Sequence, residues 1–358
     1  MFALGQEGNK ETIEVPCERS EASVSETSNV DVPKATTDCQ APGSCDEVPE
    51  ENTGESEDLA KYIAASKEFK KRYIIGRTLG SGANGVVYLA TRVADGAQVA
   101  YKCTPIHLTD LVTVREHPCP VPKEVALHQR ANKGPSAPEI VQLLDWSMDS
   151  DNYMMVMEYP APCQNLDEFI VKRGKVREGE VRVIMKQAIS AAQTCIERGV
   201  VHTDIKPGNI LINPTTLKIK LIDFGCGEFL TWKRYGFFNG TLAIRPPEYE
   251  ETCRFGGKPA TVWILGTLLF NMVFWRNAKR SHFAKAKELV QARVDLSEEC
   301  TNFLCGCLET NPSRRFHLKN LLKHEWFEPE QPSSILGKCF RWVRQSFHRG
   351  GTSGSRQS

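Results

Sequence analysis

The sequence predicts an α+β fold in two lobes, a small lobe of mainly antiparallel strands followed by a larger, mainly helical lobe. With 358 residues, the chain is long enough for two hydrophobic cores. Between Tyr73 and Cys103, β-branched and aromatic residues alternate with polar ones, which is typical of strands. After Glu158 the period changes, and apolar residues recur every three to four positions as in amphipathic helices.

Three antiparallel strands are predicted between residues 73 and 103, because Gly80, Gly82 and the pair Asp95-Gly96 interrupt the alternation. The segment DGAQ fits a hairpin between the second and third strands. The other elements predicted for this lobe are a short helix at 123–130 and two strands within 140–148 and 153–159.

Helices dominate the predicted second lobe. One long amphipathic helix is indicated by Val181, Ile184, Ala188, Ala192 and Ile196. Further helical patterns cover 259–274, 297–308 and 317–323. The longest apolar run, 261–275, has 15 residues and contains Asn271, whereas a membrane span needs about 20. A buried helix is therefore predicted there, and no transmembrane segment is expected.

The two ends differ in charge, although 45 basic and 44 acidic residues nearly balance over the whole chain. Residues 1–58 contain 15 acidic and three basic residues and few aromatic ones, so a disordered acidic tail is predicted over 1–65. Residues 331–358 contain five basic residues and no acidic ones, which predicts a basic tail. The body is also basic, but it has no nucleic-acid-binding motif, and no nucleic acid partner is expected.

Secretion is not indicated, because the opening residues MFALGQEG lack a basic segment and a long apolar segment. The 13 cysteines include no CxxC pair and no His partners at metal-ligand spacing. They are predicted to be reduced thiols of an intracellular protein.

A glycine-rich loop, LGSGANGVVY, occupies residues 79–88. Alone, this G-x-G-x-x-G match is equally compatible with a simple hairpin. Its place between two strands, rather than before a helix, favours a loop over nucleotide phosphates, which backbone can approach closely where there is no Cβ. The predicted nucleotide-binding residues of this loop are Leu79, Gly80, Ser81, Gly82, Ala83, Asn84, Gly85, Val86 and Val87.

A lysine follows in the next predicted strand, where VAYK ends at Lys102. This residue is predicted to bind the α and β phosphates, with Glu124 of the following helix orienting its ammonium group. Taken singly, Lys102 could be a solvated edge residue and Glu124 a surface acid.

The strongest motif is VVHTDIKPGNILI at 200–212, which contains H-x-D-x-K-x-x-N. Asp204 is predicted to accept the proton of an attacking hydroxyl, and Lys206 to neutralise the transferred phosphoryl group. Asn209 would bind magnesium through its amide oxygen, and Asp223 of LIDFG would supply a carboxylate to the metal. Each piece alone could be a turn, but all four in this order are improbable by chance.

This set of motifs resembles a eukaryotic protein kinase. RPPEY places Pro247 and Glu248 where kinases have A-P-E, and NPSRRF supplies Arg315, which in kinases pairs with that Glu. The resemblance implies ATP and Mg²⁺ as cofactors. It also implies a bilobal kinase fold over 73–327, with a small lobe at 73–158 that includes helix C and a large lobe at 163–327.

Within that family the chain is similar to the Pim serine/threonine kinases over about residues 70–328. The resemblance rests on IVQLLDWSMDSDNYMMVMEYPAP with its two hinge prolines, on LIDFGCG and RPPEY, on VWILG preceded by Thr261, and on LSEEC before CLETNPSRRF. It implies that adenine lies between Val87, Ala100, Met157 and Leu211. Because Pro160 has no amide hydrogen, the Glu158 carbonyl is expected to bind the adenine amino group. Asn165, which replaces an Asp after the hinge, is included among the nucleotide-binding residues.

The resemblance also implies what such a kinase does. Pim kinases phosphorylate Ser and Thr of protein substrates, are active without activation-loop phosphorylation, and are cytoplasmic and nuclear; a monomer is expected here. The chain departs from the family at Thr203, which replaces the Arg of H-R-D, at Asn84, and at Gly208, which replaces a Glu. These departures leave open a second function, a nucleotide-binding scaffold with little or no catalysis. A strong preference for basic peptides is not expected, because Gly208 and Asn165 replace acidic residues and a segment that is acidic in the family carries Arg276, Lys279, Arg280, Lys285 and Lys287.

Overall fold

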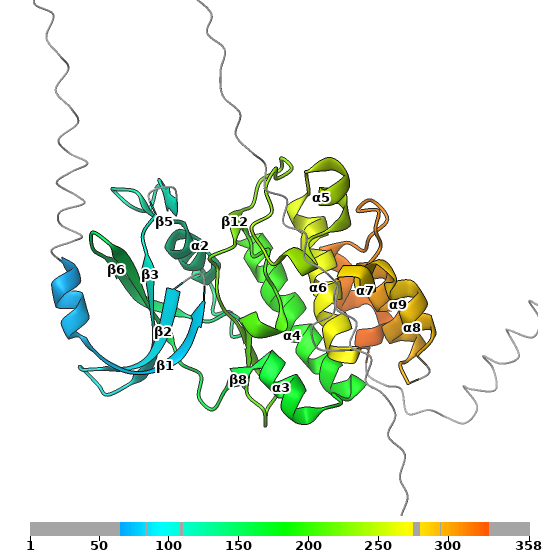
Figure 1. Ribbon diagram of the computed structural model, residues 1–358, viewed down its shortest axis with the longest axis horizontal. Coiled ribbons are helices and arrows are strands. Elements are labelled where there is room, and N and C mark those ends of the chain that lie inside the picture. Colours follow the sequence, from blue (N-terminus) through cyan, green and yellow to red (C-terminus); the bar gives the residue numbers. More distant parts are fainter. Residues whose placement is uncertain (1–64, 83–84, 108–109, 275–279, 294, 329–358) are drawn as a thin grey trace, which may run out of the picture. The chain divides into compact units, whose positions relative to one another are not determined.

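The first part of the fold is a sheet of five antiparallel strands. The computed structural model describes residues 65–82, 85–107, 110–274, 280–293 and 295–328. The strands run in the order β1-β2-β3-β7-β6 (Figure 1). Their bounds are Tyr73–Gly82 for β1, Gly85–Arg92 for β2, Gln98–Pro105 for β3, Leu143–Met148 for β6 and Asn152–Glu158 for β7.

Helix α2, at Lys123–Asn132, packs against β6 and links two apolar cores. Its Val125 joins a cluster with Met148 and Met155 of the sheet, whereas its Leu127 belongs to the core of the helical lobe. A separate cluster around Tyr101 includes Phe69, which comes from a helical segment at 65–71 that the sequence analysis did not predict.

The second lobe contains the remaining helices (Figure 1). These are α3 at Leu166–Arg173, α4 at Glu178–Glu197, α5 at Pro247–Thr252, α6 at Gly257–Val273, α7 at Arg280–Ala284, α8 at Ala286–Gln291 and α9 at Glu298–Cys307. Short 3-10 helices lie at Pro207–Asn209, Leu242–Ile244, Leu318–Lys323 and Glu325–Phe327.

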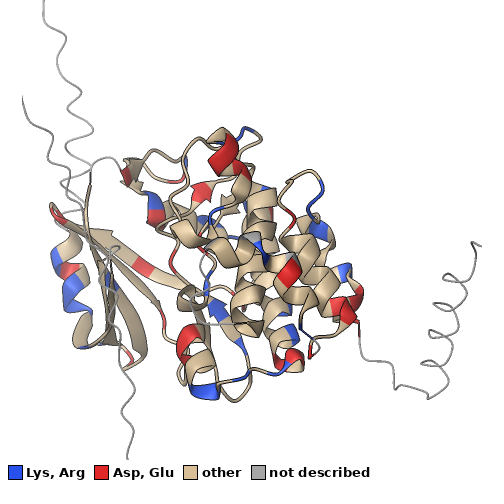
Figure 2. Cartoon of the chain, turned by 45° about the vertical axis from the view of Figure 1, so that its right-hand side comes forward, with Lys and Arg blue, Asp and Glu red and all other residues tan. Residues whose placement is uncertain are grey.

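Short strand pairs complete the topology. β4 at Leu111–Val112 pairs with β5 at Val121–Pro122, and β9 at Val200–Val201 pairs with β12 at Glu228–Phe229. A third sheet joins β8 at Gln164–Asn165, β10 at Ile210–Ile212 and β11 at Ile219–Leu221. Acidic and basic residues are interspersed over the elements of both lobes (Figure 2).

Helix α6 is buried along nearly its whole length, as the apolar run in the sequence predicts. It packs against α4 and α9 in the large core. In the described part of the chain, no helix is both long enough and apolar enough to span a membrane.

The predicted elements agree with the structure in type and order, and the α+β architecture of a β-sheet lobe and a helical lobe is confirmed. The segment at 317–323 is a 3-10 helix rather than an α-helix. Helices α3, α5, α7 and α8 were not predicted. Each has at most eight residues, which is too short for a repeating apolar stripe to stand out.

Several predictions concern residues outside the described ranges. They are the acidic tail up to residue 64, the loop residues Ala83 and Asn84, and the basic tail at 331–358.

Two residues of the predicted kinase motifs, Arg315 and Glu248, form a buried ion pair in the large lobe. Arg315 donates from Nη2 to Glu248 Oε2 at 2.8 Å and from Nη1 to Glu248 Oε1 at 3.1 Å. The same guanidinium also donates to the carbonyls of Pro259 and Glu309, each at 2.8 Å. The pairing expected from the sequence is therefore present, and both side chains are almost fully shielded from solvent.

The buried His128 is expected to contribute to a loss of stability of the fold with acidity. Burial lowers the pKa of His128 to about 4, below its usual value near 6.5. Unfolding then takes up a proton between these two values, so the stabilisation is complete above pH 6.5 and is lost as the pH falls toward 4. Urea unfolding should show a loss of about 2 kcal/mol between pH 7 and pH 5 from this group.

The matched variant for this measurement is His128→Gln, which keeps a donor for the Val141 carbonyl that the ring nitrogen Nε2 contacts at 2.8 Å. Its unfolding free energy should depend less steeply on pH between 5 and 7. Equal slopes in the two proteins would contradict the assignment.

Candidate active site

Lys102 lies between two carboxylates that come from different parts of the chain. It sits on β3, and its Nζ is 2.6 Å from Glu124 Oε1 of α2 and 3.1 Å from Asp223 Oδ1. Tyr153 donates to the second Glu124 oxygen, Oε2, at 2.9 Å. Burial alone would lower the pKa of Lys102, but the two carboxylates outweigh it and raise the pKa above its ordinary value. Lys102 is therefore a buried, charged ammonium group.

Asp223 is held in an uncommon backbone conformation, with φ of 63°. The next residue, Phe224, is fully buried and packs its ring against His128 of α2 at 4.8 Å and His202 at 4.9 Å. Burial would raise the pKa of Asp223, but the Lys102 charge and hydrogen bond lower it overall. Asp223 is thus an ionised carboxylate whose position is set by the packing of Phe224.

The loop after β9 gathers the predicted catalytic groups. Asp204 Oδ2 is 2.9 Å from Lys206 Nζ and accepts a hydrogen bond from Asn209 Nδ2 at 2.8 Å. Its other oxygen, Oδ1, accepts from the backbone amide of Thr241 at 2.8 Å. Lys206 Nζ also donates to Thr241 Oγ1 at 2.6 Å. Both Asp204 oxygens are therefore oriented by donors.

His202 contacts this loop and the residue that follows β11 through its two ring nitrogens. Its Nε2 is 3.0 Å from the Ile222 carbonyl, and its Nδ1 accepts from the Asp204 amide at 3.3 Å. Burial lowers the pKa of His202, so the neutral ring can donate at one nitrogen and accept at the other. The ring connects the Asp204 loop with the strand that leads to Asp223.

The glycine-rich loop is the turn between β1 and β2. The predicted residues Leu79, Gly80, Ser81 and Gly82 end β1, and Gly85, Val86 and Val87 begin β2. Gly85 has φ of 101°, and a Cβ there would collide with the Cys103 carbonyl of the neighbouring strand. Glycine is therefore required at 85 by the approach of β3, and not only by a ligand.

Of the four predicted adenine residues, Val87 is on β2, and the other three lie in two further strand pairs. Ala100 of β3 is opposite Met157 of β7, and Leu211 of β10 is opposite Asn165 of β8. The Glu158 carboxylate accepts from Lys220 Nζ at 2.5 Å and from the Gln142 amide at 2.8 Å.

The Asn165 side chain has a local partner that the sequence analysis did not expect. Its Oδ1 accepts from the Glu168 amide at 2.8 Å, and its Nδ2 donates to the Glu168 carboxylate at 3.1 Å. Asn165 is the N-cap of α3. The side chain predicted to contact the nucleotide is therefore used to begin this helix.

Three further residues of the site were missed or assigned no structural role. Thr241 bonds both Asp204 and Lys206, and Thr203 donates to the Cys226 carbonyl at 2.5 Å. Lys123, the first residue of α2, is 2.5 Å from Glu228 of β12. Thr241 could have been suspected from its place between the D-F-G and P-P-E motifs, but no sequence pattern points to the Lys123 contact.

The oxygen donors of Asn209 and Asp223 suit a hard divalent cation such as Mg²⁺. Asn209 donates from Nδ2 to the Asp204 carboxylate. Because Nδ2 is used in this bond, Asn209 Oδ1 is the atom that could bind a cation. Among the described residues there is no cluster of three or more His, Cys, Asp or Glu that could hold a metal. Two protein ligands are typical of Mg²⁺ that is bound mainly through phosphates.

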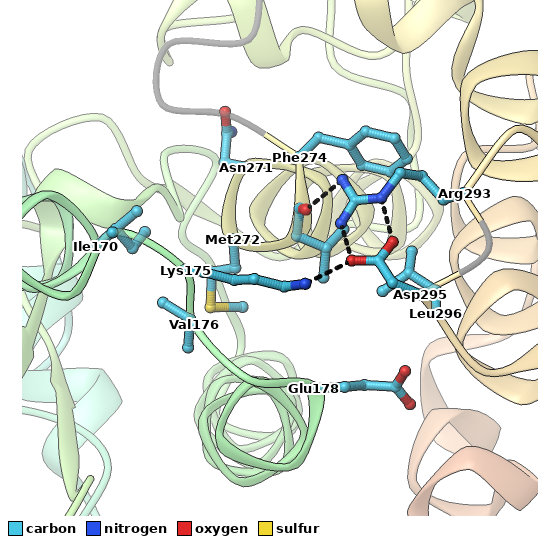
Figure 3. Close-up of a pocket in the computed structure, with 12 residues that line it drawn as sticks. Ile170, Lys175, Val176, Glu178, Asn271, Met272, Phe274, Arg293, Asp295 and Leu296 are labelled. Atoms are coloured by element: carbon cyan, nitrogen blue, oxygen red, sulfur yellow. Dashed lines mark hydrogen bonds and ion pairs between the residues drawn. The ribbon is translucent and has the colours of Figure 1, made fainter.

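A cavity of about 390 Å³ lies in the helical lobe (Figure 3). Lys175 Nζ is 2.9 Å from Asp295, which also pairs with Arg293, so an ion-pair network lines one side of it. The lining residues are Ile170, Gly174, Lys175, Val176, Glu178, Asn271, Met272, Val273, Phe274, Arg293, Asp295 and Leu296. None of the predicted nucleotide or metal residues is among them.

Comparison with known proteins agrees with this geometry. The family model described as "Protein kinase domain" matches residues 73–327. Serine/threonine-protein kinase pim-2 of Danio rerio is 36% identical over 277 residues, which cover 75% of this chain and 89% of that protein. Serine/threonine-protein kinase prk-2 of Caenorhabditis elegans is 32% identical over 271 residues, covering 74% of this chain and 60% of the relative.

A more distant relative is serine/threonine-protein kinase ULK3 of Homo sapiens, which is 30% identical over 289 residues, covering 76% of this chain and 59% of its own length. The paired Lys102 and Glu124, the Asp204 loop and the buried Arg315–Glu248 pair occur within the matched region. The chain therefore belongs to the protein kinase family, as a divergent Pim-like serine/threonine protein kinase.

Proposed function

We propose that this kinase transfers the γ-phosphate of Mg-ATP to Ser and Thr hydroxyls of protein substrates, with Asp204 as the proton acceptor. The observation that carries the proposal is the contact of Lys102 with both Glu124 and Asp223, at 2.6 and 3.1 Å. This arrangement aligns a phosphate-binding ammonium group with a metal-binding carboxylate. A protein that only bound nucleotide would not need Asp204 oriented by three donors as well.

Asp204 would accept the proton of the acceptor hydroxyl as its oxygen attacks the γ-phosphorus. The bond between the γ-phosphorus and its bridging oxygen to the β-phosphate breaks, and ADP leaves. Lys206, which already contacts Asp204 at 2.9 Å, would balance charge on the transferred group. Thr241 holds both side chains in place through its amide and hydroxyl.

Lys102 would bind the α and β phosphates while Glu124 and Asp223 keep its ammonium group in position. Asn209 and Asp223 would hold Mg²⁺, which neutralises phosphate charge when bound. The predicted loop residues from Leu79 to Val87 would cover the phosphates.

We further propose that activity does not require phosphorylation of the activation segment, residues 226–247. Thr203 stands in place of the Arg that receives such a phosphate in regulated kinases, and its hydroxyl instead bonds the Cys226 carbonyl. The Lys123–Glu228 ion pair joins α2 to the same segment. These two contacts support the segment with groups that the unmodified chain already contains.

Phosphatase treatment is accordingly expected to leave the turnover of the native kinase unchanged, whereas Lys123→Met should lower it roughly fivefold, because a partly exposed ion pair contributes about 1 kcal/mol. The measurement is initial rate against one protein substrate. The charge-exchanged double variant Lys123→Glu with Glu228→Lys should recover much of the loss. Loss of activity on dephosphorylation would contradict the proposal.

The alternative, a nucleotide-binding scaffold, is separated from the kinase by transfer of labelled phosphate from ATP to a peptide library. Transfer to Ser and Thr peptides is expected. Nucleotide binding without transfer would support the scaffold instead, an alternative suggested by Thr203, Asn84 and the missing acidic substrate contacts.

Two further proposals are a location in the cytoplasm, the nucleus or both, which rests on the family resemblance, and a monomeric state. Sedimentation of the purified protein and imaging of the tagged full chain would test them.

A further inference from the structure

The activation segment exposes two large aromatic side chains. Trp232 is 90% exposed and Phe237 is 69% exposed. Exposed apolar residues are common singly, but two large exposed aromatic side chains on one short segment make that segment a candidate interaction site. Trp is also the residue type most enriched among side chains that dominate binding energy.

The segment that carries them is firmly held. Tyr235 and Phe255 exchange backbone hydrogen bonds at 2.9 and 3.1 Å, and their rings stack at 5.1 Å. The Tyr235 hydroxyl donates to the Phe229 carbonyl at 2.8 Å and accepts from the Thr231 amide at 3.1 Å. Because these contacts fix the backbone on both sides, little ordering entropy would be lost when a partner binds Trp232.

Trp232 and Phe237 are exposed because two other rings of the segment, those of Tyr235 and Phe238, pack against the body of the lobe. Phe238 is buried and contacts the Phe255 ring at 5.4 Å, while its neighbour Phe237 faces solvent. Tyr235 likewise points into the body, and Trp232 does not. The anchoring therefore uses Tyr235 and Phe238 and leaves Trp232 and Phe237 for contacts beyond the folded chain.

Basic residues lie next to Trp232 in the chain and beside the Tyr235–Phe255 bridge. Lys233 Nζ lies 5.4 Å from the centre of the Trp232 ring. Arg234 and Arg254 are also exposed, and Lys233, Arg234 and Arg254 form no ion pair with any described residue. An acidic partner would meet these charges without having to displace an existing carboxylate.

We propose that Trp232, Phe237, Lys233, Arg234 and Arg254 form a docking surface for an acidic segment of protein substrates, one that also carries an aromatic or large aliphatic anchor. All of these residues except Arg254 belong to the segment that contains Thr241, which contacts Asp204 and Lys206. A segment bound here would hold a substrate near the proposed phosphate-transfer site. This role in substrate choice rests on the proposed function, whereas binding itself does not.

The binding test uses fluorescence anisotropy of a labelled short peptide in which one Phe is flanked by Glu and Asp, measured on the full chain without ATP. The peptide should bind, and its affinity should fall as salt is raised. Trp232→Ala and Phe237→Ala should each weaken binding at least about tenfold, and Lys233→Glu combined with Arg234→Glu should do the same and remove most of the salt dependence.

Two controls make the result specific. Val183→Ala changes an exposed apolar residue on α4 and should leave binding unchanged. A peptide with Gln in place of each acidic residue should bind at least about tenfold more weakly. Equal binding of the acidic and Gln peptides, or unchanged binding by the Trp232 and Phe237 variants, would overturn the proposal. Self-association of the native protein that disappears in Trp232→Ala would overturn it as well, in favour of an interface between copies.

The kinetic test compares one acceptor peptide with and without the acidic, Phe-containing segment attached. The attached segment should lower KM for the native kinase and not for Trp232→Ala, while kcat for the short acceptor stays the same in both. An attached segment that leaves KM unchanged would overturn the role in substrate choice. Failure of phosphate transfer altogether would instead count against the proposed kinase activity, and the anisotropy result would still stand.

Discussion

Replacing Asp204 by Asn is expected to lower kcat by about 10²- to 10⁴-fold, the range typical of a lost general base. The amide cannot accept the proton of the substrate hydroxyl, although it occupies the same space. Nucleotide binding should change little, because Lys102, Glu124 and Asp223 form their contacts without Asp204.

Steady-state phosphate transfer and a separate measurement of ATP affinity by calorimetry test this expectation together. Asp151→Asn, the same chemical change on the exposed turn between β6 and β7, serves as the matched control. Turnover retained by Asp204→Asn would remove this residue from the reaction, and a parallel loss of ATP affinity would point to a structural role.

The second large effect is expected from Arg315→Met, which should lower the free energy of unfolding by about 3 to 5 kcal/mol. The substitution leaves the Glu248 carboxylate buried without its bidentate partner. It also removes the donors to the Pro259 and Glu309 carbonyls. Urea unfolding followed by circular dichroism would measure the loss.

The neighbouring Arg314 provides the control, because it is exposed. Arg314→Met should change the unfolding free energy by less than about 0.5 kcal/mol. Adding Glu248→Gln to Arg315→Met should restore part of the stability, since the unpaired charge is then removed. Equal stability of Arg314→Met and Arg315→Met would show that the buried pair is not important for the fold.

Much of the fold could be predicted because the signals are local. The alternation from Tyr73 to Cys103 corresponds to β1, β2 and β3, and the apolar spacing from Val181 to Ile196 corresponds to α4. In β3 and α4 the period of the apolar residues reflects which side of the element faces a core. β1 is the exception, because most of its residues are exposed, including Ile74 and Ile75. Helix α3 was missed although its N-cap, Asn165, could have marked it, because eight residues are too few for a clear period.

The contacts within the site were predictable only where a motif spacing implies them. The pairs Lys102–Glu124 and Arg315–Glu248 follow from such motifs, and both are present. The bond from Asn165 Nδ2 to the Glu168 carboxylate does not follow from the resemblance, because the Asp that Asn165 replaces has no side-chain donor.

The sequence by itself determined the two-lobed α+β order, the buried α6 helix and the identity of the phosphate-transfer motifs, because these depend on residue types at short, regular spacings. The tertiary structure alone decided that Lys123 pairs with Glu228, that Thr203 bonds Cys226, and that Trp232 and Phe237 face outward. Lys123 and Glu228 are 105 positions apart. Such pairings and exposures depend on how distant elements pack against one another, which no local pattern of residues records.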